Sequence, residues 1–121
     1  MSSLLLVDDE QEASEALKMY LELKGFTVRL ALSGREGVAA VKEAVPDLVL
    51  LDLQMTGIDG WETLRQMRGI APNVRVVILT GSVPDRELEE KAVSGGALGF
   101  ITKPIRLDDL VPQIQGFLGK T

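Results

Sequence analysis

Hydrophobic residues along the chain follow two patterns, short continuous runs and longer stretches with helical spacing. Continuous apolar runs are typical of strands that are covered on both faces of a parallel sheet. The runs and one alternating stretch predict five strands, at residues 4–7, 26–30, 48–51, 74–79 and 100–101. Apolar residues three or four positions apart predict five helices, whose apolar faces lie within 13–21, 38–41, 64–67, 88–93 and 107–118. The alternation predicts a doubly wound α/β domain, although the pattern does not give the strand order.

Residues that favour helix starts support three of the predicted helices. Ser33 and Glu36 have the spacing of a capping box, in which each side chain binds the backbone N–H of the other residue. Asp59 and Glu62 have the same spacing before the third helix. Pro84 suits the first turn of the fourth helix, where no backbone N–H is needed. These signals mark where the second, third and fourth helices begin.

The last predicted helix contains two residues that disfavour a helix. Pro112 inside a helix costs about 3 kcal/mol or kinks it, and Gly116 adds about 1 kcal/mol. Two interpretations are open. Either the helix begins late or bends locally, or a binding partner stabilises it.

Composition narrows the classes of function. The chain has 121 residues, 45% of them hydrophobic and 26% charged, which predicts one globular domain over 1–121. A formal net charge of −5 disfavours nonspecific binding to nucleic acid phosphates. The absence of cysteine and histidine excludes disulfides, thiolate catalysis and imidazole chemistry, and disfavours zinc. No apolar run approaches the ~20 residues that span a bilayer and no signal peptide is recognisable, so the sequence predicts a soluble, cytoplasmic protein.

Polar residues follow four of the predicted strands at the point where each strand ends. These residues are Asp8 and Asp9 after the first strand, Asp52 after the third, Thr80 after the fourth and Lys103 after the fifth. Each has a structural explanation when taken singly: Asp8 or Asp9 could cap the first helix, threonine is common in strands, and the lysine could be solvated. Ligands of doubly wound sheets bind beyond the carboxyl ends of the strands. Polar residues at four such ends therefore predict a common site.

The acidic residues of this group predict a magnesium site. Two carboxylates about 5 Å apart repel each other by about 3 kcal/mol at an effective dielectric constant of about 20. Asp8, Asp9 and Asp52 would therefore need a proton or a bound cation, and Mg²⁺ prefers carboxylate, carbonyl and water oxygens. A phosphoryl group at this place would lie between the metal and Lys103, an arrangement used for phosphoryl transfer. Asp52 could then act as the nucleophile.

Four stretches of the chain are LLLVDDE, LVLLDLQMTGIDG, VVILTGS and GALGFITKPI. In this order and at this approximate spacing they resemble the receiver domain of bacterial two-component response regulators. The resemblance covers the whole length of the chain. It implies a flavodoxin-like fold with a five-stranded parallel sheet in the order 2-1-3-4-5, flanked by five helices.

The resemblance implies a phosphoacceptor and a metal site. Asp52 would accept a phosphoryl group from the phosphohistidine of a sensor histidine kinase or phosphotransfer protein. The absence of histidine from the chain agrees with an external donor, which could also be a small phosphodonor. Asp8, Asp9 and Asp52 would hold Mg²⁺, directly or through water, together with the backbone carbonyl of Gln54.

The resemblance also implies a switch. Lys103 would pair with the phosphoryl oxygens, and Thr80 would bind one of them in a movement coupled to Phe100. The surface of the fourth helix, fifth strand and fifth helix would change and bind a downstream target, an output domain or a second copy. No direct nucleic acid binding and no membrane insertion are expected. The domain would promote only its own phosphorylation and dephosphorylation, and would not be an enzyme in the usual sense.

The chain departs from the family pattern at several positions. Thr56 replaces the usual proline, so the loop after Asp52 loses a fixed backbone angle. Phe100 replaces the commoner tyrosine and lacks its hydroxyl. Gln54 and Ser82 lie where the family tunes the lifetime of the phosphoryl group, which the sequence does not predict.

Three other functions can be compared with this one. A phosphatase of the haloacid dehalogenase type would need a second acid two residues after the nucleophile, where this chain has Gln54. A flavodoxin-like electron carrier would need a phosphate-binding loop after the first strand, where the acidic stretch VDDE would repel phosphate. A degenerate receiver acting as a constitutive interaction module would lack part of the chemical set, which is complete here.

Overall fold

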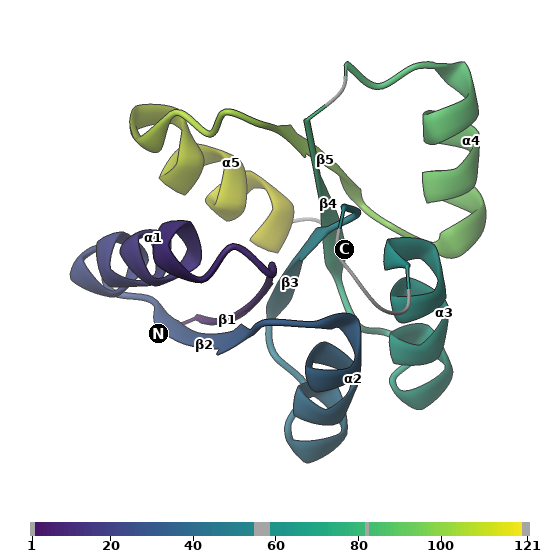
Figure 1. Ribbon diagram of the computed structural model, residues 1–121, viewed down its shortest axis with the longest axis horizontal. Coiled ribbons are helices and arrows are strands. Elements are labelled where there is room, and N and C mark those ends of the chain that lie inside the picture. Colours follow the sequence, from purple (N-terminus) through teal and green to yellow (C-terminus); the bar gives the residue numbers. More distant parts are fainter. Residues whose placement is uncertain (1, 55–58, 82, 120–121) are drawn as a thin grey trace.

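A computed structural model of the protein describes residues 2–54, 59–81 and 83–119. Strands alternate with helices along the chain, as the sequence predicts (Figure 1). The strands are β1 (Ser3–Val7), β2 (Thr27–Ala31), β3 (Leu48–Asp52), β4 (Val76–Thr80) and β5 (Gly99–Thr102). The helices are α1 (Gln11–Leu23), α2 (Gly34–Glu43), α3 (Gly60–Ile70), α4 (Arg86–Gly95) and α5 (Leu107–Leu118).

The five strands form one parallel sheet in the order β2-β1-β3-β4-β5, which confirms the order implied by the resemblance. In the centre of the sheet, Leu6 of β1 pairs with Leu30 of β2 and Leu50 of β3. The chain runs from β1 outward to β2 and then returns across β1 to β3. This change of direction lies between β1 and β3, where sheets of this kind open a crevice at the carboxyl ends of their strands.

The hydrophobic core has two halves, one on each face of the sheet. Leu5 and Val7 of β1 join the cluster that includes residues of α2 and α3, whereas Leu4 and Leu6 join the cluster that includes residues of α1 and α5. Successive residues of a strand point to opposite faces, and both faces are covered here (Figure 1). The strands are therefore continuous apolar runs. Among the described helices, none has the length and apolar character needed to cross a membrane.

The predicted helix starts are confirmed for α2 but corrected for α4. The Ser33 hydroxyl accepts a hydrogen bond from the Glu36 backbone N–H at 3.1 Å, which is one half of the predicted capping box. The Glu36 carboxylate accepts from the Leu32 N–H at 3.5 Å and not from the Ser33 backbone N–H, so the reciprocal half is corrected. In α4, Asp85 is the capping residue, and its carboxylate accepts a hydrogen bond from the Leu88 N–H at 2.8 Å. Pro84 precedes this cap, so its predicted place in the first turn is wrong. An aspartate side chain satisfies a free N–H of the helix, which proline cannot do.

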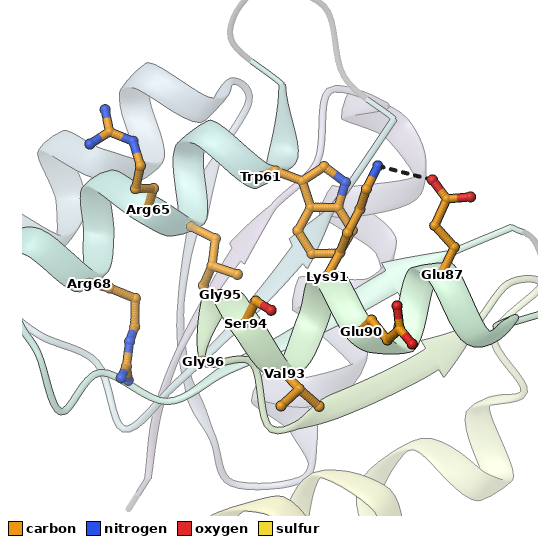
Figure 2. A pocket seen from close by; sticks show the side chains of 11 residues that line it. Trp61, Arg65, Arg68, Glu87, Glu90, Lys91, Val93, Ser94, Gly95 and Gly96 are labelled. Atoms are coloured by element: carbon orange, nitrogen blue, oxygen red, sulfur yellow. Dashed lines mark ion pairs between the residues drawn. The ribbon is translucent and has the colours of Figure 1, made fainter.

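A groove of about 1000 Å³ opens between α3 and α4 (Figure 2). Val93 of α4 lines this groove and is 78% exposed, so the prediction that it lies on the buried face of the helix is wrong. Ala92 is the buried residue of α4. The helix therefore packs on the sheet through a narrow face that includes Ala92, and the next residue, Val93, faces solvent.

The last helix, α5, continues through Pro112. It begins at Leu107, so the interpretation that it begins late is wrong. Leu110 and Ile114 are fully buried against the sheet and anchor the helix on both sides of the proline. Burial of this apolar face offsets the loss of a backbone hydrogen bond. A local bend at the proline and stabilisation by a partner stay predictions.

Candidate functional site

Acidic and basic side chains from separate strands meet at the carboxyl edge of the sheet. The Lys103 Nζ atom lies 3.0 Å from Asp8 Oδ2 and 2.8 Å from Asp52 Oδ2. One carboxylate oxygen from each of Asp8, Asp9 and Asp52 lies within 4.8 Å of the other two. The structure thus brings together four of the residues that the sequence predicts for one site.

The end of β1 fixes the position of Asp8. The Asp8 backbone N–H donates to the Ala31 carbonyl at 3.0 Å and continues the pairing of β1 with β2. The Asp8 Oδ1 atom accepts a hydrogen bond from the Glu10 N–H at 3.0 Å, which turns the other oxygen toward Lys103. The capping residue of α1 is Glu10, which makes no side-chain cap. The alternative that Asp8 or Asp9 caps this helix is therefore wrong.

Asp52 is the last residue of β3 and is 3% exposed. Its Oδ1 atom accepts a hydrogen bond from the Gln54 N–H at 2.9 Å, while Oδ2 faces Lys103. Gly60, at the start of α3, packs directly beneath this segment. A Cβ atom on Gly60 would lie 2.8 Å from Leu53 Cα and 3.3 Å from the Asp52 carbonyl oxygen. The sequence patterns do not predict this role of Gly60, although a glycine immediately after the predicted cap is a signal for it.

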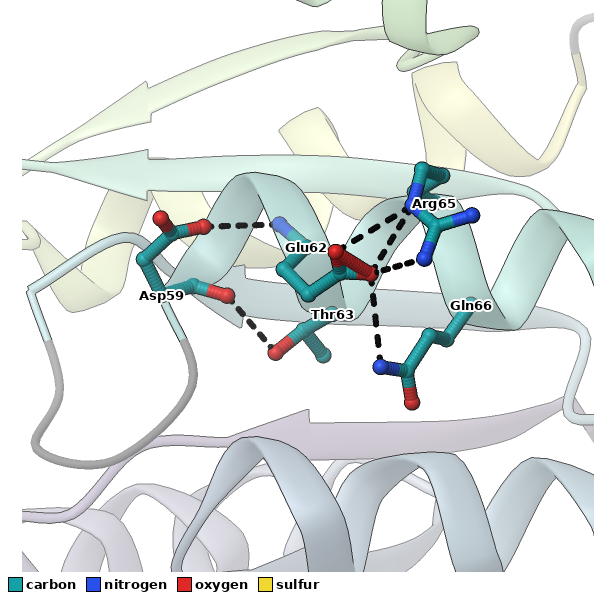
Figure 3. A network of polar contacts seen from close by, with 5 residues as sticks. All are labelled: Asp59, Glu62, Thr63, Arg65 and Gln66. Atoms are coloured by element: carbon teal, nitrogen blue, oxygen red, sulfur yellow. Dashed lines mark hydrogen bonds and ion pairs between the residues drawn. The ribbon is translucent and has the colours of Figure 1, made fainter.

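A polar network fixes the first turn of α3 beside that segment (Figure 3). The Asp59 carboxylate accepts a hydrogen bond from the Glu62 N–H at 2.7 Å, which confirms the predicted cap. The Thr63 hydroxyl donates to the Asp59 carbonyl at 2.9 Å. Arg65 pairs with Glu62 at 2.6 Å, and hydrogen bonding to this guanidinium lowers the pKa of Glu62. Gln66 donates to the same carboxylate at 3.3 Å, so the turn is held from several sides.

Thr80 and Lys103 are joined through the backbone. Thr80 ends β4 and is buried, and its carbonyl accepts a hydrogen bond from the Lys103 N–H at 2.7 Å. Phe100 of β5 pairs in register with Ile78 of β4 and is partly buried against the core. The threonine and the phenylalanine therefore lie in the same strand pair, and the lysine directly follows it. Their roles in a switch stay predictions.

Burial and charge act in opposite directions at the centre of the site. Burial raises the pKa of the Asp52 carboxyl, and hydrogen bonds from Lys103 and from the Gln54 amide offset this rise only in part. Burial also disfavours the charged form of Lys103, but its hydrogen bonds to Asp52 and Asp8 outweigh this effect and raise its pKa. The ammonium therefore stays charged near neutral pH. Oxygens of three carboxylates lie within 4.8 Å of one another beside a single ammonium, and this oxygen-rich set fits Mg²⁺.

The profile of the response regulator receiver domain matches residues 4–115. The chain belongs to this family. Among curated relatives of the receiver domain, it is 34% identical over 120 residues to the uncharacterized transcriptional regulatory protein YkoG of Bacillus subtilis, covering 95% of this chain and 50% of that protein. It is 32% identical over 121 residues to the response regulator MprA of Mycolicibacterium vanbaalenii, covering 98% of this chain and 51% of that protein. The receiver domain thus spans about half the length of these two relatives.

Solved structures agree with this assignment. The chemotaxis protein CheY4 of Vibrio cholerae superimposes with a TM-score of 0.90 at 25% identity, covering 97% of this chain and 98% of that one. A CheY-like receiver domain protein from Methanospirillum hungatei gives a TM-score of 0.90 at 27% identity, covering 98% and 94%. Thr56, which replaces the usual proline, lies outside the described residues. Ser82, at a position where the family tunes phosphoryl lifetime, also lies outside them.

Proposed function

We propose that this receiver domain is the phosphoacceptor switch of a two-component phosphorelay, with Asp52 as the phosphorylated residue. One observation carries the proposal. The Asp52 carboxylate is buried at the crevice of the sheet, within 2.8 Å of an ammonium and beside two further acids. The donor is the phosphohistidine of a sensor histidine kinase or phosphotransfer protein, or a small phosphodonor.

In the transfer, a carboxylate oxygen of Asp52 attacks phosphorus and forms a new O–P bond. The N–P bond of the phosphohistidine breaks, and its electron pair returns to the imidazole nitrogen. Asp8, Asp9, Asp52 and the backbone carbonyl of Gln54 would hold Mg²⁺, which when bound neutralises charge on the phosphoryl oxygens. Lys103 orients these oxygens and supplies further positive charge from the β5 side. Dephosphorylation is attack of water on the same phosphorus.

The phosphoryl group acts through Thr80 and Phe100. It adds about −1.5 to −2 of charge and three acceptor oxygens. The Thr80 hydroxyl donates to one of these oxygens, and the resulting movement biases two arrangements of α4, β5 and α5. That surface binds a target protein, an output domain or a second copy. The domain promotes only its own phosphorylation and dephosphorylation, acts in the cytoplasm and turns over no separate substrate.

Incubation with acetyl phosphate tests the proposed function directly. We expect intact mass measurement to show one added phosphoryl group in the presence of Mg²⁺. Chelation of Mg²⁺ should abolish this gain, because the acidic cluster would then repel the incoming phosphate. Equal phosphorylation with and without chelator would contradict the role of the metal, and no phosphorylation in Mg²⁺ would contradict the function.

A further inference from the structure

The groove between α3 and α4 leaves apolar side chains open to solvent (Figure 2). The partly exposed Trp61 and the buried Leu64 line it from α3, and Val93 lines it from α4. Val93 is 78% exposed, whereas the valines of the hydrophobic core are nearly inaccessible to solvent. The groove lies on the α2–α4 side of the sheet, and no residue of the acidic cluster lines it. It is therefore separate from the phosphorylation site.

The two edges of the groove differ in charge. The α3 edge carries Arg65 and Arg68, and the α4 edge carries Glu87 and Glu90. Figure 2 shows the arginines on one side and the glutamates on the other. Lys91 also lies on the α4 edge, where it pairs with Glu87 at 3.7 Å. The groove thus has a basic edge, an apolar middle and a predominantly acidic edge.

A surface with this arrangement is complementary to itself. A twofold rotation that exchanges the two edges places the basic edge of one copy against the acidic edge of the other. We propose that two copies of the chain pair through this groove, with α3 of each copy facing α4 of its partner. The same rotation brings the two apolar middles together and removes Val93 and the exposed part of Trp61 from water.

The charged residues can exchange partners at low cost. Arg65 pairs with Glu62 at 2.6 Å, and its side chain is 74% exposed. Glu90 pairs with Arg86 at 3.1 Å, and both side chains are more than half exposed. Exposed ion pairs contribute little to stability, so replacing them by contacts between copies loses little. Arg68 is different, because it donates to the Val74 carbonyl at 3.2 Å and lies against Gly96. The test therefore leaves Arg68 unchanged.

Sedimentation of the intact chain tests the pairing. We expect a monomer–dimer equilibrium at concentrations below about 1 mM, the range of weak specific complexes. Val93→Asp, Arg65→Glu and Glu90→Arg should each raise the dimer dissociation constant by about tenfold or more, since each places a charge in the apolar middle or opposes like charges. Lys42→Glu on α2 makes the same charge change as Arg65→Glu and should leave the dissociation constant unchanged.

Mixing the two charge variants provides the decisive comparison. Arg65→Glu removes the net positive charge of the α3 edge in one chain, and Glu90→Arg turns the net charge of the α4 edge from negative to positive in the other. An equal mixture should form a heterodimer about as stable as the wild-type dimer, although neither variant pairs well alone. A wild-type chain that stays monomeric up to about 1 mM would overturn the proposal. So would a mixture that pairs no better than its components, or an unchanged dissociation constant in Val93→Asp.

Discussion

We expect Asp52→Asn to abolish phosphorylation by acetyl phosphate, with a loss of rate of at least about 10³-fold, because it removes the proposed nucleophile. The amide keeps the shape of the carboxylate but has no anionic oxygen to attack phosphorus. Asp8 and Lys103 remain in place, so the variant tests the nucleophile rather than the whole site. Intact mass after incubation with Mg²⁺ and acetyl phosphate measures the effect. Asp108→Asn, at an exposed position in the first turn of α5, is the matched control and should be phosphorylated like the wild type.

Unfolding of the Asp52→Asn variant separates lost chemistry from lost structure. Burial raises the pKa of Asp52, so the ionised carboxylate is less favourable in the folded chain than in the unfolded chain. The protonated carboxyl favours the folded chain, so its contribution to the free energy of unfolding is fully present below the pKa of the unfolded chain. This contribution is lost as the pH rises through the higher pKa of the folded chain. At neutral pH without Mg²⁺, the variant should therefore resist denaturant better than the wild type. A variant that gains the phosphoryl group at full yield would place the modification at another residue.

Lys103→Met should change phosphorylation and metal affinity in opposite directions. The rate of phosphorylation falls by about 10² to 10³-fold, the usual cost of removing one positioned donor to a developing charge. The affinity for Mg²⁺ rises by about tenfold, because the ammonium lies 2.8 Å and 3.0 Å from two proposed ligands and competes with the cation. Calorimetric titration and the acetyl phosphate assay at saturating Mg²⁺ measure the two effects.

Lys42→Met makes the same charge change on α2 and controls for net charge in both assays. It should alter neither the phosphorylation rate nor the metal affinity by more than about twofold, since exposed charges far apart are screened. A Lys103→Met variant with unchanged Mg²⁺ affinity would contradict the electrostatic link between the lysine and the acids. A variant with unchanged phosphorylation would remove the lysine from the transfer step.

The sequence predicted the elements that carry the site because both faces of the sheet are covered. A strand in this position must be apolar throughout, so the first polar residue after it marks the carboxyl edge. Asp8 and Asp52 follow from this reasoning, and the strand boundaries lie within two residues of the predicted runs. The strand order came only from the family resemblance, since pairing between distant segments leaves no periodic trace in the sequence.

Features that depend on competition between neighbouring residues were harder to predict. Pro84 and Asp85 both suit a helix start, and the residue whose side chain binds a free N–H became the cap. Leu88 and Ala92 are four positions apart and share a face of α4, whereas Val93 directly follows Ala92, lies about 100° around the helix from it and is exposed. Gly60 is required by the close approach of α3 to Leu53, a contact that spacing alone does not reveal.

The proposed function requires a divalent cation that binds the acids at the ends of β1 and β3. Calorimetric titration of Mg²⁺ into the wild type and into Asp8→Asn tests this claim most directly. One Mg²⁺ should bind each wild-type chain, and the variant should bind it at least about tenfold more weakly, because an anionic oxygen ligand is lost. Absence of binding to the wild type, or equal affinity in the two proteins, would contradict the account.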